Sequence, residues 1–145
     1  MSIGAMIERL LLPQHVALVS ATASLRTTAA QLARVPDGPV VLRRVSTVAD
    51  DLAGSMAEHF AREERSLFPA MSAGQAPSHA SATFHQHHEA VATRIRWLQL
   101  LAAEVRRDVG INLGTTALFA GMAALSRLVH RHRELEQWVV LTRRP

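Results

Sequence analysis

The chain has 145 residues, 48% of them hydrophobic, which is enough for one domain with a buried core. It contains no cysteine, so disulfide bonds, thiolate metal sites and cysteine nucleophiles are excluded, and any bound metal must be held by His, Asp, Glu or water. The formal net charge is +4 and Lys is absent, but the arginines are scattered with few aromatic residues among them, which argues against nucleic-acid binding.

No segment has the pattern of a signal peptide or a membrane span. Residues 1–12 are apolar, but they include Glu8 and Arg9 and lack a basic start. No uncharged run reaches the ~20 residues that a membrane-spanning helix needs. We therefore expect a single cytoplasmic domain over residues 1–145, with no membrane partner.

Apolar residues at three- and four-residue spacing predict four long amphipathic helices. The first begins at about Leu12, because Pro13 is tolerated in a first turn, and ends at residue 34 before a turn that contains Pro and Gly. The other three are expected at about Val40 to Met71, Ser81 to Asp108 and Asn112 to Thr142.

Two of the apolar stripes continue through a histidine and a glutamate. The stripe of the second helix leads into His59 and Glu63, and that of the fourth leads into His132 and Glu136. The four-residue spacing places both side chains of a pair on one helix face, one turn apart. Burying an imidazole and a carboxylate together is costly unless they are paired or bound to something.

No stretch alternates as a β-strand would, so we predict an all-α, up-down-up-down four-helix bundle. His15 and His88 lie near the starts of the first and third helices, each 44 residues ahead of one of the pairs. The two arms of each helical hairpin, from ligand to turn, are both about 29 Å long, so their side chains return to one level. Six side chains should therefore meet at one end of the bundle: His15, His59, Glu63, His88, His132 and Glu136.

Four imidazoles and two carboxylates in a bundle core suit two transition-metal ions, with coordination positions left open. The lack of thiolates favours iron, manganese or zinc. A single His-x-x-x-Glu is usually an exposed ion pair, but two such pairs on core faces with matched spacing indicate a metal site.

The remaining histidines fit this site less well. His130 and Glu134 also have four-residue spacing, but they lie about 100° or more off the apolar stripe. His85 could reach the same space as His88, and His87 lies on the other flank, so the sequence leaves open whether either is an additional ligand. A solvated surface position is expected for His79, His87 and His130.

These motifs resemble the hemerythrin-like, or HHE cation-binding, family over nearly the whole chain, from His15 to Leu141. The segment HFAREERSLFPAM is similar to the family's His-x-x-x-Glu-Glu-x-x-Leu-Phe-Pro segment. The residues around His15, His88 and His132 are similar to the family's first-, third- and fourth-helix ligand segments.

The resemblance implies a non-haem di-iron centre bridged by the two glutamates and an oxo, hydroxo or water ligand, with zinc or manganese as alternative metals. It assigns the role of metal ligand to all six converging side chains. Hemerythrins that store O₂ reversibly usually have a further histidine one turn before the third-helix ligand, and here that residue is Phe84. This departure favours reaction with, or sensing of, O₂, H₂O₂ or NO over simple O₂ carriage.

Three functions therefore remain open. The first is a di-iron oxidoreductase that decomposes peroxide, as catalases do, or reacts with NO. The second is a reversible O₂-binding or sensing module, and the third is a metal-binding bundle without turnover. The expected partners are diatomic or peroxide ligands, and nothing in the sequence indicates the electron donor or an oligomeric state.

Overall fold

The computed structural model describes residues 5, 9, 11–34, 39–71, 79–107 and 112–142, and within these ranges there is no strand. Of residues 12, 39, 79–80, 105–107, 112–115 and 139–142 only the backbone is described. The long helices are α2 (Leu12–Arg34), α3 (Pro39–Arg62), α5 (His79–Arg107) and α6 (Asn112–Thr142). Helix α3 continues through a π-helical turn, η2 (Glu63–Leu67), into the short α4 (Phe68–Met71).

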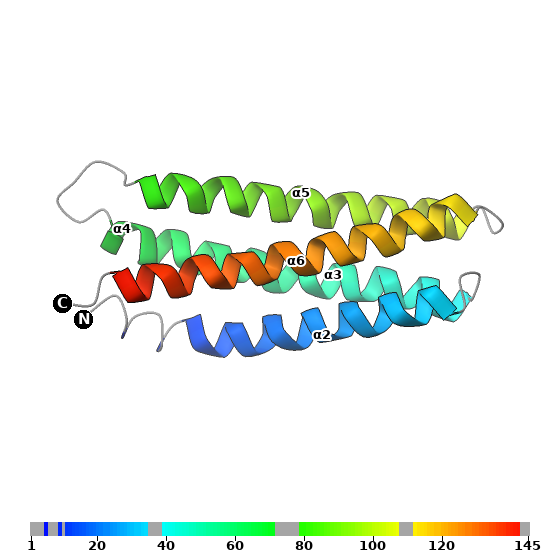
Figure 1. Cartoon of the computed structure of the whole chain (residues 1–145), viewed down its shortest axis with the longest axis horizontal. Coiled ribbons are helices and arrows are strands. Elements are labelled where there is room, and N and C mark those ends of the chain that lie inside the picture. The colour runs from blue at the N-terminus through cyan, green and yellow to red at the C-terminus, as the bar shows by residue number, and fades with distance from the viewer. Residues whose placement is uncertain are drawn as a thin grey trace.

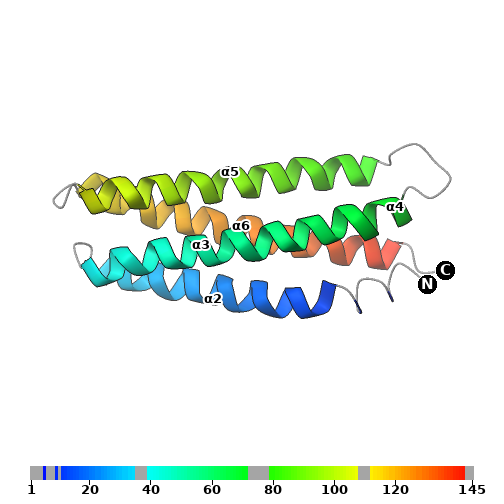
Figure 2. The same ribbon diagram turned by 180° about the vertical axis from the view of Figure 1, so that it is seen from behind.

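The four long helices run alternately up and down and lie side by side along the long axis of the molecule (Figure 1). Each packs most closely on two neighbours, in the order α2, α3, α5, α6 and back to α2. The reverse view shows α3 crossing in front of α6 between α5 and α2 (Figure 2). This arrangement confirms the predicted all-α, up-down-up-down four-helix bundle.

The helix bounds agree closely with the apolar periodicity. Helix α6 spans Asn112–Thr142 as expected, and α5 begins two residues before the expected Ser81. The π turn was not expected. Pro69 accounts for part of it, because proline has no N–H and its ring crowds the carbonyl four residues back, which belongs to Arg65 within η2. Instead, the Phe68 N–H donates to the Glu63 carbonyl, five residues back.

Buried apolar side chains form two clusters. The main core fills most of the bundle's length, and its largest contributions come from Leu18, Leu25, Leu32, Val45, Leu52, Met56, Val91, Ile95, Leu98, Leu118, Met122, Leu125 and Val129. A smaller group, called the end cluster here, consists of Leu11, Leu67, Phe68, Met71 and Phe84. In the segments of α2, α3–α4 and α5 the converging residues fall between these two clusters, so apolar packing covers them from both directions. On α6 they follow Val129, the last main-core residue of that helix.

None of the described helices combines the length and apolarity that crossing a bilayer requires.

Candidate metal centre

The structure brings all six sequence-predicted side chains together at the end of the bundle where α2 and α5 begin and α4 and α6 end (Figure 1). His15 comes from α2, His88 from α5, and the two histidine–glutamate pairs from α3–η2 and from α6. The side chains of His59, Glu63 and His132 are fully buried, and those of Glu136 and His88 nearly so. His15 retains the largest exposure, at 16%.

Each carboxylate faces two imidazole nitrogens. Oε1 of Glu136 lies 2.7 Å from His15 Nε2 and 3.3 Å from His59 Nε2. Oε2 of Glu63 lies 2.8 Å from His88 Nε2 and 3.3 Å from His132 Nε2. The centre therefore has two halves of identical composition, each with two imidazoles and one carboxylate.

The two halves are in direct contact with each other. The Nε2 atoms of His59 and His132 are 3.0 Å apart, and His59 Nε2 is also 3.8 Å from Glu63 Oε2. His59, Glu63, His132 and Glu136 each supply one donor atom to a group lying within 4.8 Å. His59 and His132 are 73 positions apart in the chain, and the same interval relates the other equivalent residues of the two hairpins.

This donor set fits bound cations. Two nitrogen lone pairs or a lone pair and a carboxylate oxygen repel each other unless a proton or a cation lies between them. Both oxygens of Glu63, Oε2 of Glu136 and Nε2 of His88 are buried without a hydrogen bond of normal geometry among the described residues. Donors bound at ~2.1 Å and at right angles around one ion lie ~3 Å apart, which matches these separations. Metal ions would satisfy these atoms at once.

The Glu63 carboxyl is ionised despite its burial. Burial alone would raise the pKa of this group, but the imidazoles of His132 and His88 beside its oxygens, together with the charge of His132 and His59, hold the pKa well below its usual value. A buried carboxylate needs positive charge around it. Metal ions would supply that charge while the imidazoles stay unprotonated, because the same nitrogen lone pairs would bind the metal.

Two polar side chains sit behind the inward-facing imidazoles. Gln14 Oε1 is 3.4 Å from His59 Nδ1 and accepts a hydrogen bond from the Nδ1–H group. This arrangement leaves the Nε2 lone pair of His59 directed at the centre. Glu64 Oε1 lies 3.7 Å from His88 Nδ1 and 3.8 Å from His85 Nδ1. Because Glu64 is about half exposed, its interaction with His88 is weaker than that of Gln14 with His59.

Aromatic rings form one wall of the centre. Phe60 stacks on His88 at a centroid distance of 3.7 Å and meets His132 edge-on. Phe84, one helical turn before His88 in α5, has its ring centroid 5.9 Å from that of His132 and 6.2 Å from that of His88. Carbon atoms therefore occupy this side, and Phe84 offers no additional donor.

The π turn carries Glu63 itself. A π turn widens the helix locally and re-aims the side chains around it, and such turns occur frequently at functional sites. Arg65 Nε donates to the Ala61 carbonyl at 2.9 Å, so this side chain gives a hydrogen-bond partner to a carbonyl on the edge of the irregular segment. The turn is thus supported by local hydrogen bonding.

Of the other four histidines, two are exposed, one has no described side chain, and His87 is half-buried. His130 is exposed and pairs with Glu134 at 3.4 Å, away from the centre, as expected. His85 is also exposed and contacts Glu64 and the Phe68 ring, not the two central carboxylates. The side chain of His79 lies outside the described residues.

The expectation of a solvated position is wrong for His87. This side chain is half-buried, and neither ring nitrogen has solvent contact or a hydrogen-bond partner in the described part of the chain. Its ring lies 5.6 Å from that of His132 and nearly parallel to it. Burial first, and then the charges of His132, His88 and Arg131, lower the pKa of His87 to about 4, so it is neutral at pH 7.

Sequence reasoning missed Gln14 and Phe60. Both are neighbours in the chain of a converging histidine, His15 and His59 respectively, and this adjacency was the available signal. Gln14, however, contacts His59 on the adjoining helix, and Phe60 contacts His88 and His132 across the bundle. Both contacts depend on how the helices rotate against each other, which periodicity fixes only coarsely.

Comparison with known proteins gives one result that covers almost the whole chain. Residues 6–142 match the model of the hemerythrin HHE cation binding domain. No curated protein and no solved structure matches the chain. The matched range includes both helical hairpins and all six converging side chains. The chain therefore belongs to the hemerythrin HHE cation-binding domain family.

Proposed function

We propose that the chain holds two iron ions at this centre and uses them to bind and react with a small oxidant, O₂, H₂O₂ or NO. One observation carries the proposal: each buried carboxylate faces two imidazole nitrogens, at 2.7 and 3.3 Å for Glu136 and at 2.8 and 3.3 Å for Glu63. Two histidines and one carboxylate with open positions are the donor set of many non-haem iron sites.

His15, His59 and Glu136 would hold one ion, and His88, His132 and Glu63 the other. Both carboxylates lie where the halves meet and have buried oxygens without hydrogen bonds, so either could be shared between the ions. Bound iron would supply an open coordination position for the oxidant and the accompanying redox change.

The protein's own groups prepare the centre for this chemistry. Gln14 keeps the proton of His59 on Nδ1, so that Nε2 remains a lone-pair donor. The main core and the end cluster cover the centre with apolar side chains, which limits the entry of water and so limits side reactions. Phe84 contributes no nitrogen, so the aromatic wall does not fill a coordination position.

Metal analysis of the purified protein combined with an optical spectrum tests the proposal. We expect about two iron ions per chain, an absorption band in the near ultraviolet, and a change in that band when H₂O₂ or NO is added. Sustained peroxide decomposition would indicate an enzyme, and a reversible change with O₂ alone would indicate a carrier or sensor. Zinc at the centre with no spectral response would show that the proposed redox function is wrong.

A further inference from the structure

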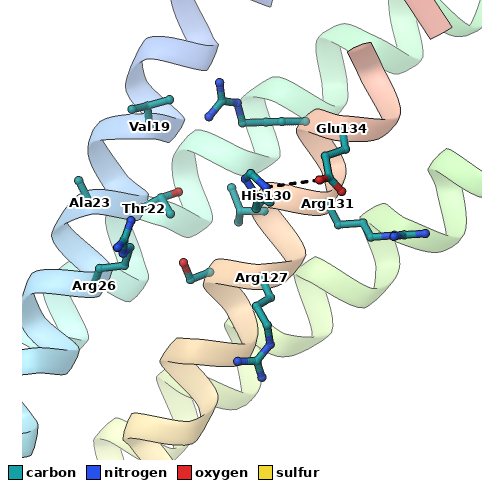
Figure 3. A pocket seen from close by; sticks show the side chains of 11 residues that line it. Val19, Thr22, Ala23, Arg26, Arg127, His130, Arg131 and Glu134 are labelled. Carbon is teal, nitrogen blue, oxygen red and sulfur yellow. Dashed lines mark ion pairs between the residues drawn. The ribbon is translucent and has the colours of Figure 1, made fainter. Parts of the chain in front are cut away.

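A second concave site lies outside the metal centre, in the groove between α2 and α6 (Figure 3). Its volume is about 440 Å³, within the range of small-molecule sites in proteins. None of the six converging side chains lines it. The groove is nevertheless close to them, because Val19 is one helical turn after His15 and Arg133 directly follows His132.

The charged residues that line this groove are mostly positive. Four arginines line it: Arg26 from α2 and Arg127, Arg131 and Arg133 from α6; the side chain of Arg131 extends away from α2 (Figure 3). The one carboxylate among its lining residues, Glu134, is turned to His130 at 3.4 Å (Figure 3). Within the described ranges none of these four arginines has a carboxylate partner in the chain, so the positive charge of those that face the groove is open to a ligand.

The floor of the groove is apolar. Val129 is buried, and Val19 and Ala23 present hydrocarbon from the α2 side. The Thr22 hydroxyl donates to the Leu18 carbonyl at 2.7 Å, which occupies its proton within its own helix. A ligand seated here would place an apolar body against carbon atoms and its charged group against the arginines.

We propose that this groove binds a small organic oxyanion, a carboxylate or a phosphate ester attached to an apolar body. Guanidinium groups match both oxyanions because their planar N–H donors can bind two oxygens at once. The unpaired arginines favour an anion, and the hydrocarbon floor favours an organic anion over an inorganic one. The concave shape favours a small ligand over a flat protein surface.

Calorimetric titration of the purified full-length protein with four probes tests this. Phenyl phosphate and phenylacetate carry both features and differ in the oxyanion, so their ranking identifies the preferred group. Inorganic phosphate lacks the apolar body, and benzyl alcohol lacks the charge. We expect saturable binding of at least one aromatic anion, weakened by added salt, with both deficient probes bound roughly tenfold more weakly.

Matched variants locate the binding. Arg26→Gln and Arg133→Gln should each weaken it roughly threefold to tenfold, whereas Arg43→Gln, which makes the same charge change on exposed α3, should not. Ala23→Phe should block the groove without changing its charge, and Ala90→Phe on exposed α5 serves as its control. Circular dichroism verifies that each variant is folded.

Either of two results would overturn the proposal. One is the absence of saturable binding of both aromatic anions by the folded wild-type protein. This includes the case in which polyglutamate, titrated as a fifth probe, is the only ligand that binds, which would make this face a docking surface for acidic proteins. The other is equal weakening by Arg43→Gln and the groove variants, which would show general charge attraction. Neither readout depends on iron, so failure of the proposed oxidant chemistry would leave this test intact.

Discussion

His15 and His88 occupy equivalent places in the two halves of the metal centre, yet their surroundings differ. The two histidines approach their carboxylates to nearly the same distance, 2.7 and 2.8 Å. The His88 ring is enclosed by Phe60, Phe68 and Phe84. His15 has no such aromatic contact in the described residues apart from the ring of His59, and its side chain is 16% exposed.

The two halves of the centre therefore differ in how well they are shielded from solvent. The enclosed half fixes imidazole positions through packing and keeps water away. In the other half the side chain of His15 is partly exposed to solvent. The set of two imidazoles and one carboxylate is thus repeated in both halves, whereas the solvent exposure of the histidines is not.

The largest effect is expected from Glu63→Ala. Glu63 Oε2 lies within 3.8 Å of His59, His88 and His132, so its loss should affect both halves. Metal content should fall from about two ions to near zero, and the stability linked to metal binding, several kcal/mol, should be lost. Elemental analysis and thermal unfolding measure both. Glu58→Ala is the control, because Glu58 is exposed on α3 and pairs only with Arg62 at 2.9 Å; equal metal loss in both variants would contradict the assignment.

His88→Ala and His15→Ala should each remove about one metal ion but differ in their effect on folding. His88→Ala leaves a cavity among three phenylalanines and should cost about 2–4 kcal/mol of unfolding free energy in the metal-free protein. His15→Ala, at a partly exposed position, should cost about 1 kcal/mol. Urea unfolding of the chelator-treated variants measures the difference. Equal costs would show that the aromatic wall does not distinguish the halves.

Phe84→His places a nitrogen donor in the enclosed half. In the metal-free protein the new imidazole is buried without a partner and should destabilise the fold by about 1–3 kcal/mol. Metal should recover most of that stability, and the reaction with H₂O₂ should slow because an open position is filled. Stopped-flow absorbance compares the rates, with Phe84→Leu controlling for loss of the ring. An unchanged rate in the metal-loaded Phe84→His protein would contradict this account.

The orienting side chains should have smaller, unequal effects. Gln14→Leu removes the acceptor of the His59 Nδ1 proton and should weaken metal binding roughly tenfold or more. Glu64→Gln should weaken it less, because Glu64 is about half exposed and lies 3.7 Å from His88 Nδ1. Competition with a chelator gives both affinities, and the reverse order would place the stronger support in the His88 half.

The smallest effect concerns pH. Burial lowers the pKa of His87 from 6.5 to about 4, so on acidification the unfolded chain takes up this proton first. The folded state therefore keeps its full stability with respect to His87 above pH 6.5. Its free energy of unfolding decreases as the pH falls from 6.5 toward 4, because the unfolded chain binds the proton and the folded one does not. His87→Phe should lessen the acid-dependent decrease in unfolding temperature. Parallel curves for the two chelator-treated proteins between pH 7 and 4 would show that His87 titrates normally.

Sequence periodicity was sufficient for the bundle and for the meeting of six side chains. Helix α6 has the expected bounds, and equal arm lengths in both hairpins bring His15 level with His59 and His88 level with His132. These are properties of single helices and of length, which local sequence determines. The ligand roles themselves remain a proposal.

Details that depend on how helices rotate against each other were not predictable in the same way. His87 lies on the flank of its helix, and only the position of α6 shows that its ring stacks on His132. The side chain of Gln14 finds its partner on another helix. The π turn arises from a changed hydrogen-bond register, for which Pro69 was the only local hint.

That π turn has a consequence for how this chain can change over time. A π turn holds one residue more than an α turn, so Leu67 and Phe68 follow Glu63 out of phase with the α3 residues before it. Deleting one residue between positions 64 and 66 would restore an ordinary α-helix and rotate Leu67, Phe68 and Met71 of the end cluster by about 100° while leaving His59 in place. Insertions and deletions at this point would therefore alter the cover of the centre independently of its donors.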